Sequence, residues 1–375
     1  MILNPKSDFH LNHWTCDERV FNNKQSLLLH ASQHGGKIQY HYNDHIFSQF
    51  DWSIEPTQTL SELYAERARS LRDQYDYIVI MFSGGSDSTT VIESFLNAGI
   101  HIDEVISYGG WNHKIDRDTD AWNVEVLKGG RSIIERLKEH DVKFTMLNLL
   151  DSFDQVYQSN EWVLTSDHSM TIWTDFLQHT IFQLDHTNKL IEKGKKVCYV
   201  WGIEKPTLCV YQNDYYVVFP DWLYACWRYD KTIQQGHQVE FFFSDVACAN
   251  IISKQCHTII NHLESRMYKS QIANFLMGGG GYTQEDVRNL ILELCYPNWK
   301  KDTFTLGKHS NYLWSLKWQS FYHLAQDTSQ YQTWVGGVTD VLQSINPKYR
   351  HPTKNLKPFY CQYRIRPLRS NLLST

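Results

Sequence analysis

The sequence predicts an α/β protein built on a doubly wound, mainly parallel β-sheet. Three observations lead to this fold class. Between residues 75 and 206, short apolar runs alternate with stretches of helical periodicity, which is the pattern of repeated strand–helix units. The runs are apolar throughout, as expected for parallel strands that are buried on both faces. Glycines follow several of the runs, where they end the regular structure.

Four apolar segments are the predicted strands of this sheet, and helices are predicted between and before them. A helix begins after Thr59, which forms a capping-box pattern with Glu62, and its apolar residues repeat at helical spacing to about residue 73. The predicted strands are 77–82, 104–108, 142–147 and 196–201, and the predicted helices between them are 89–96, most of 120–140, and 169–184.

The segments on either side of this alternation look different. Residues 1–56 predict a small N-terminal β-containing cap, with a strand at 37–42 after a Gly-Gly turn. Residues 57–215 form the predicted α/β domain. Residues 216–375 predict a mostly helical, aromatic-rich region, with strands at 215–220 and 239–243 and helices at 251–268, 283–294 and 310–324.

The composition is typical of a globular protein, with 42% apolar and 21% charged residues and a net charge of −5. No run of 18 apolar residues is present, and the first ten residues lack a signal pattern, so we expect a cytoplasmic protein without a membrane span. The eight cysteines include no C-x-x-C pair, which argues against a zinc ribbon and favours reduced, buried thiols. A homo-oligomer is compatible with this composition.

The charge is distributed unevenly, because the stretch from Val341 to the end contains seven basic residues and no acidic one. Since the whole chain carries −5, residues 1–340 carry −12. Aromatic residues are interleaved with the bases, so residues 348–369 are a candidate surface for nucleic acid. The favoured alternative is a tail that packs on the acidic body of its own chain. The basic residues are Lys348, Arg350, Lys354, Lys357, Arg364, Arg366 and Arg369.

The motif that carries chemistry is the string S-G-G-S-D-S at residues 83–88, between a buried strand and a helix. Its glycines allow the backbone to approach a ligand closely. The serine hydroxyls and the first N–H groups of the following helix point towards the same place, and together they form a nest for phosphate. The motif also follows a parallel strand, where open α/β sheets bind ligands. We therefore predict a polyphosphate-binding loop.

Two other phosphate-binding loops do not fit, since neither G-x-x-x-x-G-K-[ST] nor G-x-G-x-x-G follows this strand. The string instead resembles S-G-G-x-D-S, the signature of the N-type ATP pyrophosphatase (PP-loop) superfamily. The specific match covers about eight residues, and the strand–helix order extends the resemblance loosely over residues 75–206. The resemblance implies attack on the α-phosphate of ATP, an adenylated substrate and the release of pyrophosphate with Mg²⁺.

The resemblance also implies roles for individual residues. The loop would hold the β- and γ-phosphates, and Asp87 would lie near them and near the Mg²⁺ ion. At the end of the second strand, Ser107 and Tyr108 would border adenine and ribose, although a plain strand-to-loop turn is an equal alternative. After the fourth strand, Glu204 is a candidate Mg²⁺ ligand and Lys205 a candidate catalytic residue, with a surface ion pair as the alternative. The candidate phosphate-binding residues are Ser83, Gly84, Gly85, Ser86, Asp87, Ser88 and Thr89.

Within the superfamily, the region from Thr57 to Val105 is most similar to the asparagine synthetase-like branch. Amidating members of that branch begin with the catalytic cysteine of a glutaminase domain, whereas residue 2 here is Ile2. The Glu-Cys-Gly-x-His string of the reductases and the four-cysteine zinc site of the deazapurine nitrile synthases are also absent.

The sequence therefore predicts an enzyme that uses ATP and Mg²⁺ to adenylate a carboxyl, amide or carbonyl oxygen of an unidentified acceptor. A nitrogen nucleophile would then displace AMP, with sulfur as a less favoured choice. Two alternatives stay open. One is an accessory module that binds ATP or AMP without turnover, and the other is an enzyme of the same superfamily that modifies a tRNA or DNA base.

Overall fold

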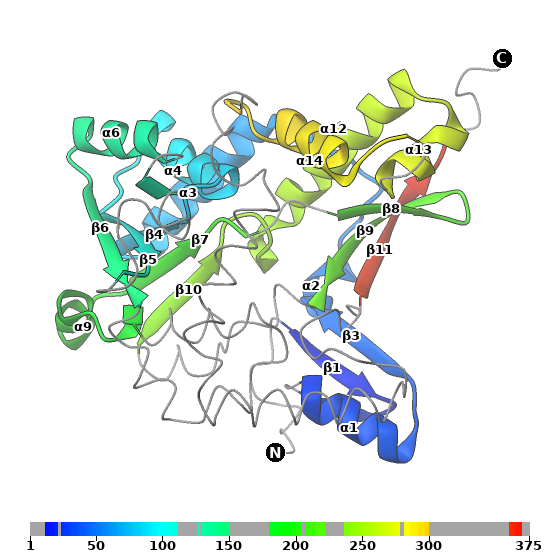
Figure 1. Cartoon of the computed structure of the whole chain (residues 1–375), viewed down its shortest axis with the longest axis horizontal. Coiled ribbons are helices and arrows are strands. Elements are labelled where there is room, and N and C mark those ends of the chain that lie inside the picture. Colours follow the sequence, from blue (N-terminus) through cyan, green and yellow to red (C-terminus); the bar gives the residue numbers. More distant parts are fainter. Residues whose placement is uncertain are drawn as a thin grey trace.

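The structure is a computed structural model of the 375-residue chain. It describes residues 12–21, 24–111, 126–127, 130–149, 180–203, 207–221, 236–277, 281–299 and 360–369. Within these ranges the chain forms one parallel sheet, two smaller antiparallel sheets and the helices that cover them (Figure 1).

The parallel sheet has five strands in the order β10-β7-β4-β5-β6, and this confirms the predicted α/β fold class. All four strand pairs run parallel, with β4 in the centre. The four strands predicted from the sequence lie at the expected places within one or two residues. The strands are β4 (Tyr77–Phe82), β5 (Glu104–Gly109), β6 (Lys143–Asn148), β7 (Val197–Trp201) and β10 (His237–Phe241).

The sequence pattern did not predict that the fifth strand, β10, belongs to this sheet. It lies beyond residue 215, in the stretch predicted as the C-terminal region, yet it pairs with β7 over its full length. Because β10 is an edge strand, it alternates buried Val239 and Phe241 with the more polar Gln238 and Glu240. It therefore lacks the continuous apolar pattern that identifies the central strands.

Alternate residues of β4 pack into two separate cores. Ile78, Ile80 and Phe82 face α3 and α4, whereas Val79 and Met81 face the side on which α9 packs. Figure 1 shows α3, α4 and α6 together along one side of the sheet, with α9 at the opposite side. The helices of this unit are α3 (Leu60–Gln74), α4 (Ser86–Asn97), α6 (Arg131–Glu139) and α9 (Asp185–Glu192).

Helix α3 begins where the sequence predicts. The Thr59 side chain accepts from the Glu62 backbone N–H, and the Glu62 carboxylate accepts from the Thr59 backbone, so the capping box is confirmed. Helix α4 begins earlier than the predicted residue 89, because the loop serines already belong to its first turn. Helix α6 begins directly after Gly130, which agrees with the predicted interruption there.

The N-terminal residues form a small antiparallel sheet with the order β2-β1-β3, as predicted for the β-containing cap. Trp14 of this sheet donates from its indole nitrogen to Asp221 at 2.9 Å, and the hydroxyl of Tyr42 donates to the Ser244 carbonyl. These buried contacts join the cap to the ends of later strands. Its elements are β1 (Asn12–Cys16), β2 (Arg19–Phe21), α1 (Lys24–His34), β3 (Ile38–Tyr42) and α2 (Asp44–Phe47).

The third sheet contains β8 (Thr207–Tyr211), β9 (Asp214–Pro220) and β11 (Tyr360–Pro367), and it brings the C-terminal part of the basic stretch onto the body of the chain. Arg364 forms a bidentate pair with Asp214, and Arg366 forms one with Glu264. Arg369 also lies 3.6 Å from Glu264. The described part of the stretch therefore packs on acidic groups of its own chain.

The C-terminal helices cover the sheet next to α3. The predicted helix 251–268 is α12 (Ala249–Arg266), which follows the short 3-10 helix η4 (Val246–Cys248), and α13 (Lys269–Leu276) is a separate helix. The predicted helix 283–294 is α14 (Gln284–Cys295), and Thr283 caps it as expected. The predicted helix 310–324 and most of the predicted helix 169–184 lie outside the described residues.

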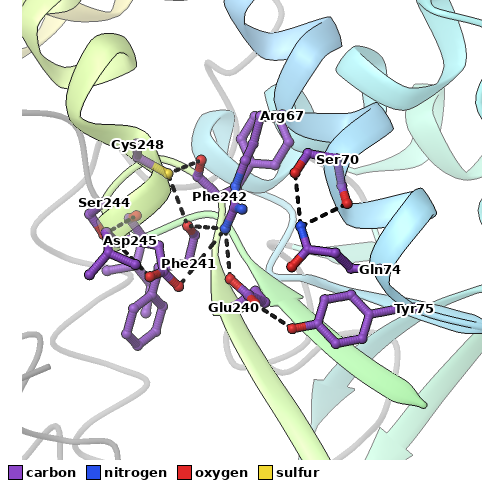
Figure 2. Close-up of polar contacts among 12 residues, drawn as sticks. Arg67, Ser70, Gln74, Tyr75, Glu240, Phe241, Phe242, Ser244, Asp245 and Cys248 are labelled. Atoms are coloured by element: carbon purple, nitrogen blue, oxygen red, sulfur yellow. Dashed lines mark hydrogen bonds and ion pairs between the residues drawn. The ribbon is translucent and has the colours of Figure 1, made fainter. Parts of the chain in front are cut away.

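A buried ionic cluster joins α3 to the loop after β10 (Figure 2). The Arg67 guanidinium, with 4% of its side chain exposed, lies 2.7 Å from Glu240 and 3.9 Å from Asp245. Burial tends to raise the pKa of Glu240, but the Arg67 charge together with hydrogen bonds from Asp245, Tyr75 and Arg67 outweighs it, and the pKa is lowered. Burial and the Glu240 charge raise the pKa of Asp245 to about 8. The cluster therefore holds one shared proton near neutral pH.

Replacing Arg67 by Met should destabilise the protein by about 3–5 kcal/mol, because the buried Glu240 carboxylate loses its counter-charge. Urea denaturation measures the change. The matched control is Arg131→Ala, which removes an exposed pair with Glu135 and should change the free energy of unfolding by less than about 0.5 kcal/mol. Equal effects of the two variants would contradict the structural role of the cluster.

Replacing Asp245 by Asn should give a stability gain that depends on pH. The folded protein holds a proton on Asp245 that the unfolded chain releases near the ordinary aspartate pKa of 3.8, so wild-type stability falls as the pH rises from about 4 to about 8. Asn stays neutral and avoids this loss. The difference in the free energy of unfolding between variant and wild type should grow from about pH 4 to about pH 8 and level off above that, as measured by denaturation at several pH values. A difference that does not vary with pH would contradict the raised pKa.

Candidate functional site

The motif predicted to bind phosphate lies at the carboxyl end of the central strand. β4 ends at Phe82 and α4 begins at Ser86, so three residues form the turn. Gly84 has a φ of +79°, a left-handed conformation that favours glycine. Gly85 is the N-cap of α4 and provides no side-chain cap. The first backbone N–H groups of α4, which have no carbonyl partner within the helix, therefore lie at this buried turn, where the two glycines place no side chain beside them.

The serines of the loop hold one another in place. The Ser88 hydroxyl accepts from the Ser83 backbone N–H at 3.3 Å and donates to the Gly85 carbonyl at 3.2 Å. Ser86 and Ser88 are buried, whereas Ser83 is partly exposed. The Thr89 hydroxyl is buried and has no hydrogen-bond partner within the described residues. The loop is thus preformed, with a buried hydroxyl at its base that a ligand or water could satisfy.

A neighbouring strand closes tightly against the loop. Gly202 follows β7, and a Cβ atom placed on it would lie 2.9 Å from the Ser88 backbone nitrogen and 2.9 Å from the Asp87 carbonyl carbon. Both contacts are with backbone, which cannot move aside as a flexible side chain would. Glycine at this position therefore allows the end of β7 to meet the start of α4.

Asp87 lies in the first turn of α4, and its carboxylate is oriented by a residue far along the chain. The Tyr296 hydroxyl donates to Asp87 Oδ1 at 2.5 Å. Tyr296 is 1% exposed and follows α14. Burial, reinforced by the Asp87 charge, raises the pKa of Tyr296 well above its ordinary value, so the phenol stays a donor. The sequence analysis did not identify Tyr296, because no local motif links it to the loop.

The two residues predicted at the end of the second strand have different surroundings. Ser107 is fully buried, and its hydroxyl donates to the Phe82 carbonyl at 2.6 Å, which ties the end of β5 to the end of β4. Tyr108 is partly exposed, and its ring lies 6.4 Å from the Trp201 ring, on the face of the sheet opposite α4. Of the two, Tyr108 is the one whose side chain has exposed surface.

The remaining predicted site residues, Glu204 and Lys205, lie outside the described residues, although Gly202 and Ile203 just before them are described. Residues 348–359 of the basic stretch and Gly278–Gly280 also lie outside the described residues. Within the described part of the chain, no group of three or more His, Cys, Asp and Glu side chains is arranged to hold a metal ion.

The loop fits a polyphosphate with its magnesium ion. Its glycines place no side chain beside the first N–H groups of α4, and the dipole of α4 favours negative charge at this end of the helix. Magnesium prefers oxygen ligands and is usually bound through one or two carboxylates plus substrate phosphates. The Asp87 carboxylate has the chemistry of such a ligand. A carboxylate can accept several bonds, so its bond to Tyr296 is compatible with this role.

A cleft of about 390 Å³ lies between α3 and α4, beside Pro297 and Asn298. Its α4 residues, Thr90 to Ala98, follow the first turn of the helix rather than the phosphate-binding loop. We therefore do not assign this cleft to the acceptor.

Among the helices that the structure describes, none has the length and apolarity needed to span a bilayer.

Replacing Gly202 by Ala should weaken nucleotide binding and lower stability by about 1–3 kcal/mol, because the methyl group meets backbone on both sides. Thermal denaturation and ATP titration measure the two effects. Gly99→Ala is the control, since Gly99 has a left-handed φ of +66° but has open space around it. That variant should lower the free energy of unfolding by about 1–2 kcal/mol and leave the affinity for ATP unchanged. Loss of affinity in both variants would remove the special role of Gly202.

Comparisons with known proteins give distant matches among solved structures alone. No known protein family matches the chain, and no curated protein is similar in sequence. Among solved structures, the U34-tRNA thiolase NcsA from Methanococcus maripaludis with its [4Fe-4S] cluster aligns with 10% identity and a TM-score of 0.25, over 80% of this chain and 83% of that one. The fold assigned above rests on the parallel sheet of this chain itself, and no argument below depends on this match.

Proposed function

We propose that the chain is an ATP pyrophosphatase of the PP-loop type, which binds the polyphosphate of ATP at residues 83–88. The observation that carries the proposal is the loop itself. The string S-G-G-S-D-S stands between a central, doubly buried strand and a helix whose N-cap is Gly85, with Gly84 in a left-handed conformation. This combination supports binding of the β- and γ-phosphates by backbone N–H groups and serine hydroxyls.

The proposed reaction is the attack of an acceptor oxygen on the α-phosphate, with pyrophosphate as the leaving group. Such a displacement needs positioning and neutralisation of charge more than a nucleophile from the protein. The loop would hold the leaving group, and the start of α4 would stabilise its developing charge. Asp87 would hold the magnesium ion, which, when bound, neutralises charge on the phosphate oxygens.

The acceptor is proposed to carry a carboxyl, amide or carbonyl oxygen, which becomes adenylated before a nitrogen nucleophile displaces AMP. Glu204 and Lys205 are proposed as a second magnesium ligand and a catalytic cation, because they follow β7 in the sequence and β7 runs parallel to β4, which leads into the loop. Tyr108 is proposed to border the nucleoside, with Ser107 supporting the strand beneath it.

A nucleic-acid acceptor is less favoured by the described residues. Arg364, Arg366 and Arg369 lie at two acidic groups of the same chain, Asp214 and Glu264, so most of their charge is already balanced locally. The remaining bases of the stretch lie outside the described residues. We therefore keep a small-molecule acceptor as the primary proposal and test nucleic acid as one member of the substrate panel.

The direct test is release of pyrophosphate from ATP labelled at the α-phosphate, assayed with the full chain, Mg²⁺ and a panel of carboxylates, amides, amines, tRNA and DNA. Formation of labelled AMP together with pyrophosphate, dependent on one member of the panel, supports the proposal. Release of inorganic phosphate and ADP contradicts it. ATP binding without any turnover across the panel instead favours an accessory module.

Asp87→Asn should lower pyrophosphate release by about 10²- to 10³-fold, because a neutral amide holds magnesium poorly in the reacting complex. Asn retains an oxygen that accepts the Tyr296 hydrogen bond, so the thermal midpoint should change little. The control is Glu66→Gln, which neutralises an exposed acid on α3 and should leave the rate unchanged. A rate for Asp87→Asn within about twofold of wild type would remove Asp87 from the reaction.

A further inference from the structure

The hydrogen bond between Tyr296 and Asp87 links the proposed phosphate-binding loop to the C-terminal helices. The two residues are 209 positions apart in the chain, and their oxygens are 2.5 Å apart. A phenol that donates to a carboxylate forms a strong, charge-assisted bond. Because the carboxylate is the only charged group of the S-G-G-S-D-S string, its orientation matters for any cation that accompanies the phosphates.

Tyr296 itself is held rigidly. Its ring stacks on Phe243, with the centroids 5.4 Å apart and the planes 30° from parallel. Its backbone N–H donates to the Leu292 carbonyl at the end of α14. Phe243 belongs to the loop after β10, so Tyr296 is fixed between the fifth strand of the sheet and the last described helix. Its hydroxyl is therefore a positioned donor rather than a mobile one.

A second tyrosine extends the same network without touching Asp87. The Tyr64 hydroxyl donates to the Cys295 carbonyl at 2.7 Å and accepts from the Gln255 amide at 2.8 Å. Tyr64 is 2% exposed, and so is as deeply buried as Tyr296. It thus supports the backbone next to Tyr296, and it provides a matched buried tyrosine with a purely structural contact.

The position of Asp87 in the first turn of α4 explains why its carboxylate needs such a donor. An aspartate in the first turn of a helix has N–H groups of its own helix as competing partners. Those are the same N–H groups that would bind phosphate at this loop. A donor that holds Oδ1 competes with these N–H groups for the carboxylate and leaves its other lone pairs for a cation.

We propose that Tyr296 is a positioning residue that orients the Asp87 carboxylate for the magnesium ion bound with ATP. The inference rests on the proposed function of the loop. Tyr296 does not contact the phosphates in this role, and it acts only through Asp87. It makes the C-terminal helices part of the nucleotide site rather than a separate region.

The test compares Tyr296→Phe with Tyr64→Phe in the full chain. Each change removes one buried hydroxyl and keeps the ring. The main readout is the dissociation constant of Mn²⁺, measured by electron paramagnetic resonance in the presence of α,β-methylene ATP, a probe that cannot be cleaved to AMP and pyrophosphate. We expect metal binding to weaken about tenfold in Tyr296→Phe and less than about twofold in Tyr64→Phe. Thermal midpoints should fall by similar amounts in both.

Two further variants complete the design. In the Asp87→Asn background, Tyr296→Phe should cause no additional loss of metal affinity, since two residues that act as a unit are not additive. If Tyr296→Phe does not fold, Phe243→Leu removes the ring that holds Tyr296 while keeping both partners. It should weaken metal binding about two- to threefold.

The outcomes separate the two proposals. If wild type binds the analogue with Mn²⁺ and Tyr296→Phe binds it equally well, the tyrosine is a structural tether and the inference is wrong while the loop assignment stands. Equal losses of metal affinity in the two Tyr→Phe variants would overturn the inference in the same way. If wild type shows no metal-dependent binding of the analogue and releases no pyrophosphate, the proposed function itself fails.

Discussion

The burial of β4 on both faces is the constraint on which the rest of the structure depends. Ile78, Ile80 and Phe82 need α3 and α4 above them, and Val79 and Met81 need a second layer below. A strand covered in this way ends at the edge of the sheet, where the chain must turn sharply to return as α4. The turn at Ser83–Gly85 therefore holds its main-chain groups at a fixed place, with a rigid strand before it and a helix after it.

Close approach of backbone to backbone then shapes the site. Gly202 brings the end of β7 against Asp87 and Ser88, while the Ser107 hydroxyl ties β5 to β4 on the other side. The Phe242 N–H donates to the Trp201 carbonyl, which extends the same arrangement to β10. The carboxyl ends of neighbouring strands are thus joined into one rigid edge. Such rigidity favours a site that works by positioning its ligand.

Long-range polar contacts fix the surrounding elements to this edge. The Arg67 cluster holds the loop after β10 against α3, and Phe243 from that loop supports Tyr296. Tyr296 in turn reaches Asp87. Burying a polar group costs free energy unless the group has a hydrogen-bond or ionic partner. Because other placements would break these pairs, the contacts specify one arrangement of the C-terminal helices. The helices that follow the α/β unit are in this way connected to its functional loop.

The sequence by itself determined the fold class, four of the five strands of the parallel sheet, the capped starts of α3 and α14, and the place of the S-G-G-S-D-S turn between a strand and a helix. All of these depend on local patterns, such as continuous apolar runs, capping boxes and a glycine-serine string. Only the tertiary structure decided that β10 completes the sheet, that the end of the basic stretch forms β11 against Asp214 and Glu264, and that Tyr296 orients Asp87. These features join residues far apart in the chain or depend on an edge strand's mixed pattern, and neither leaves a local signal.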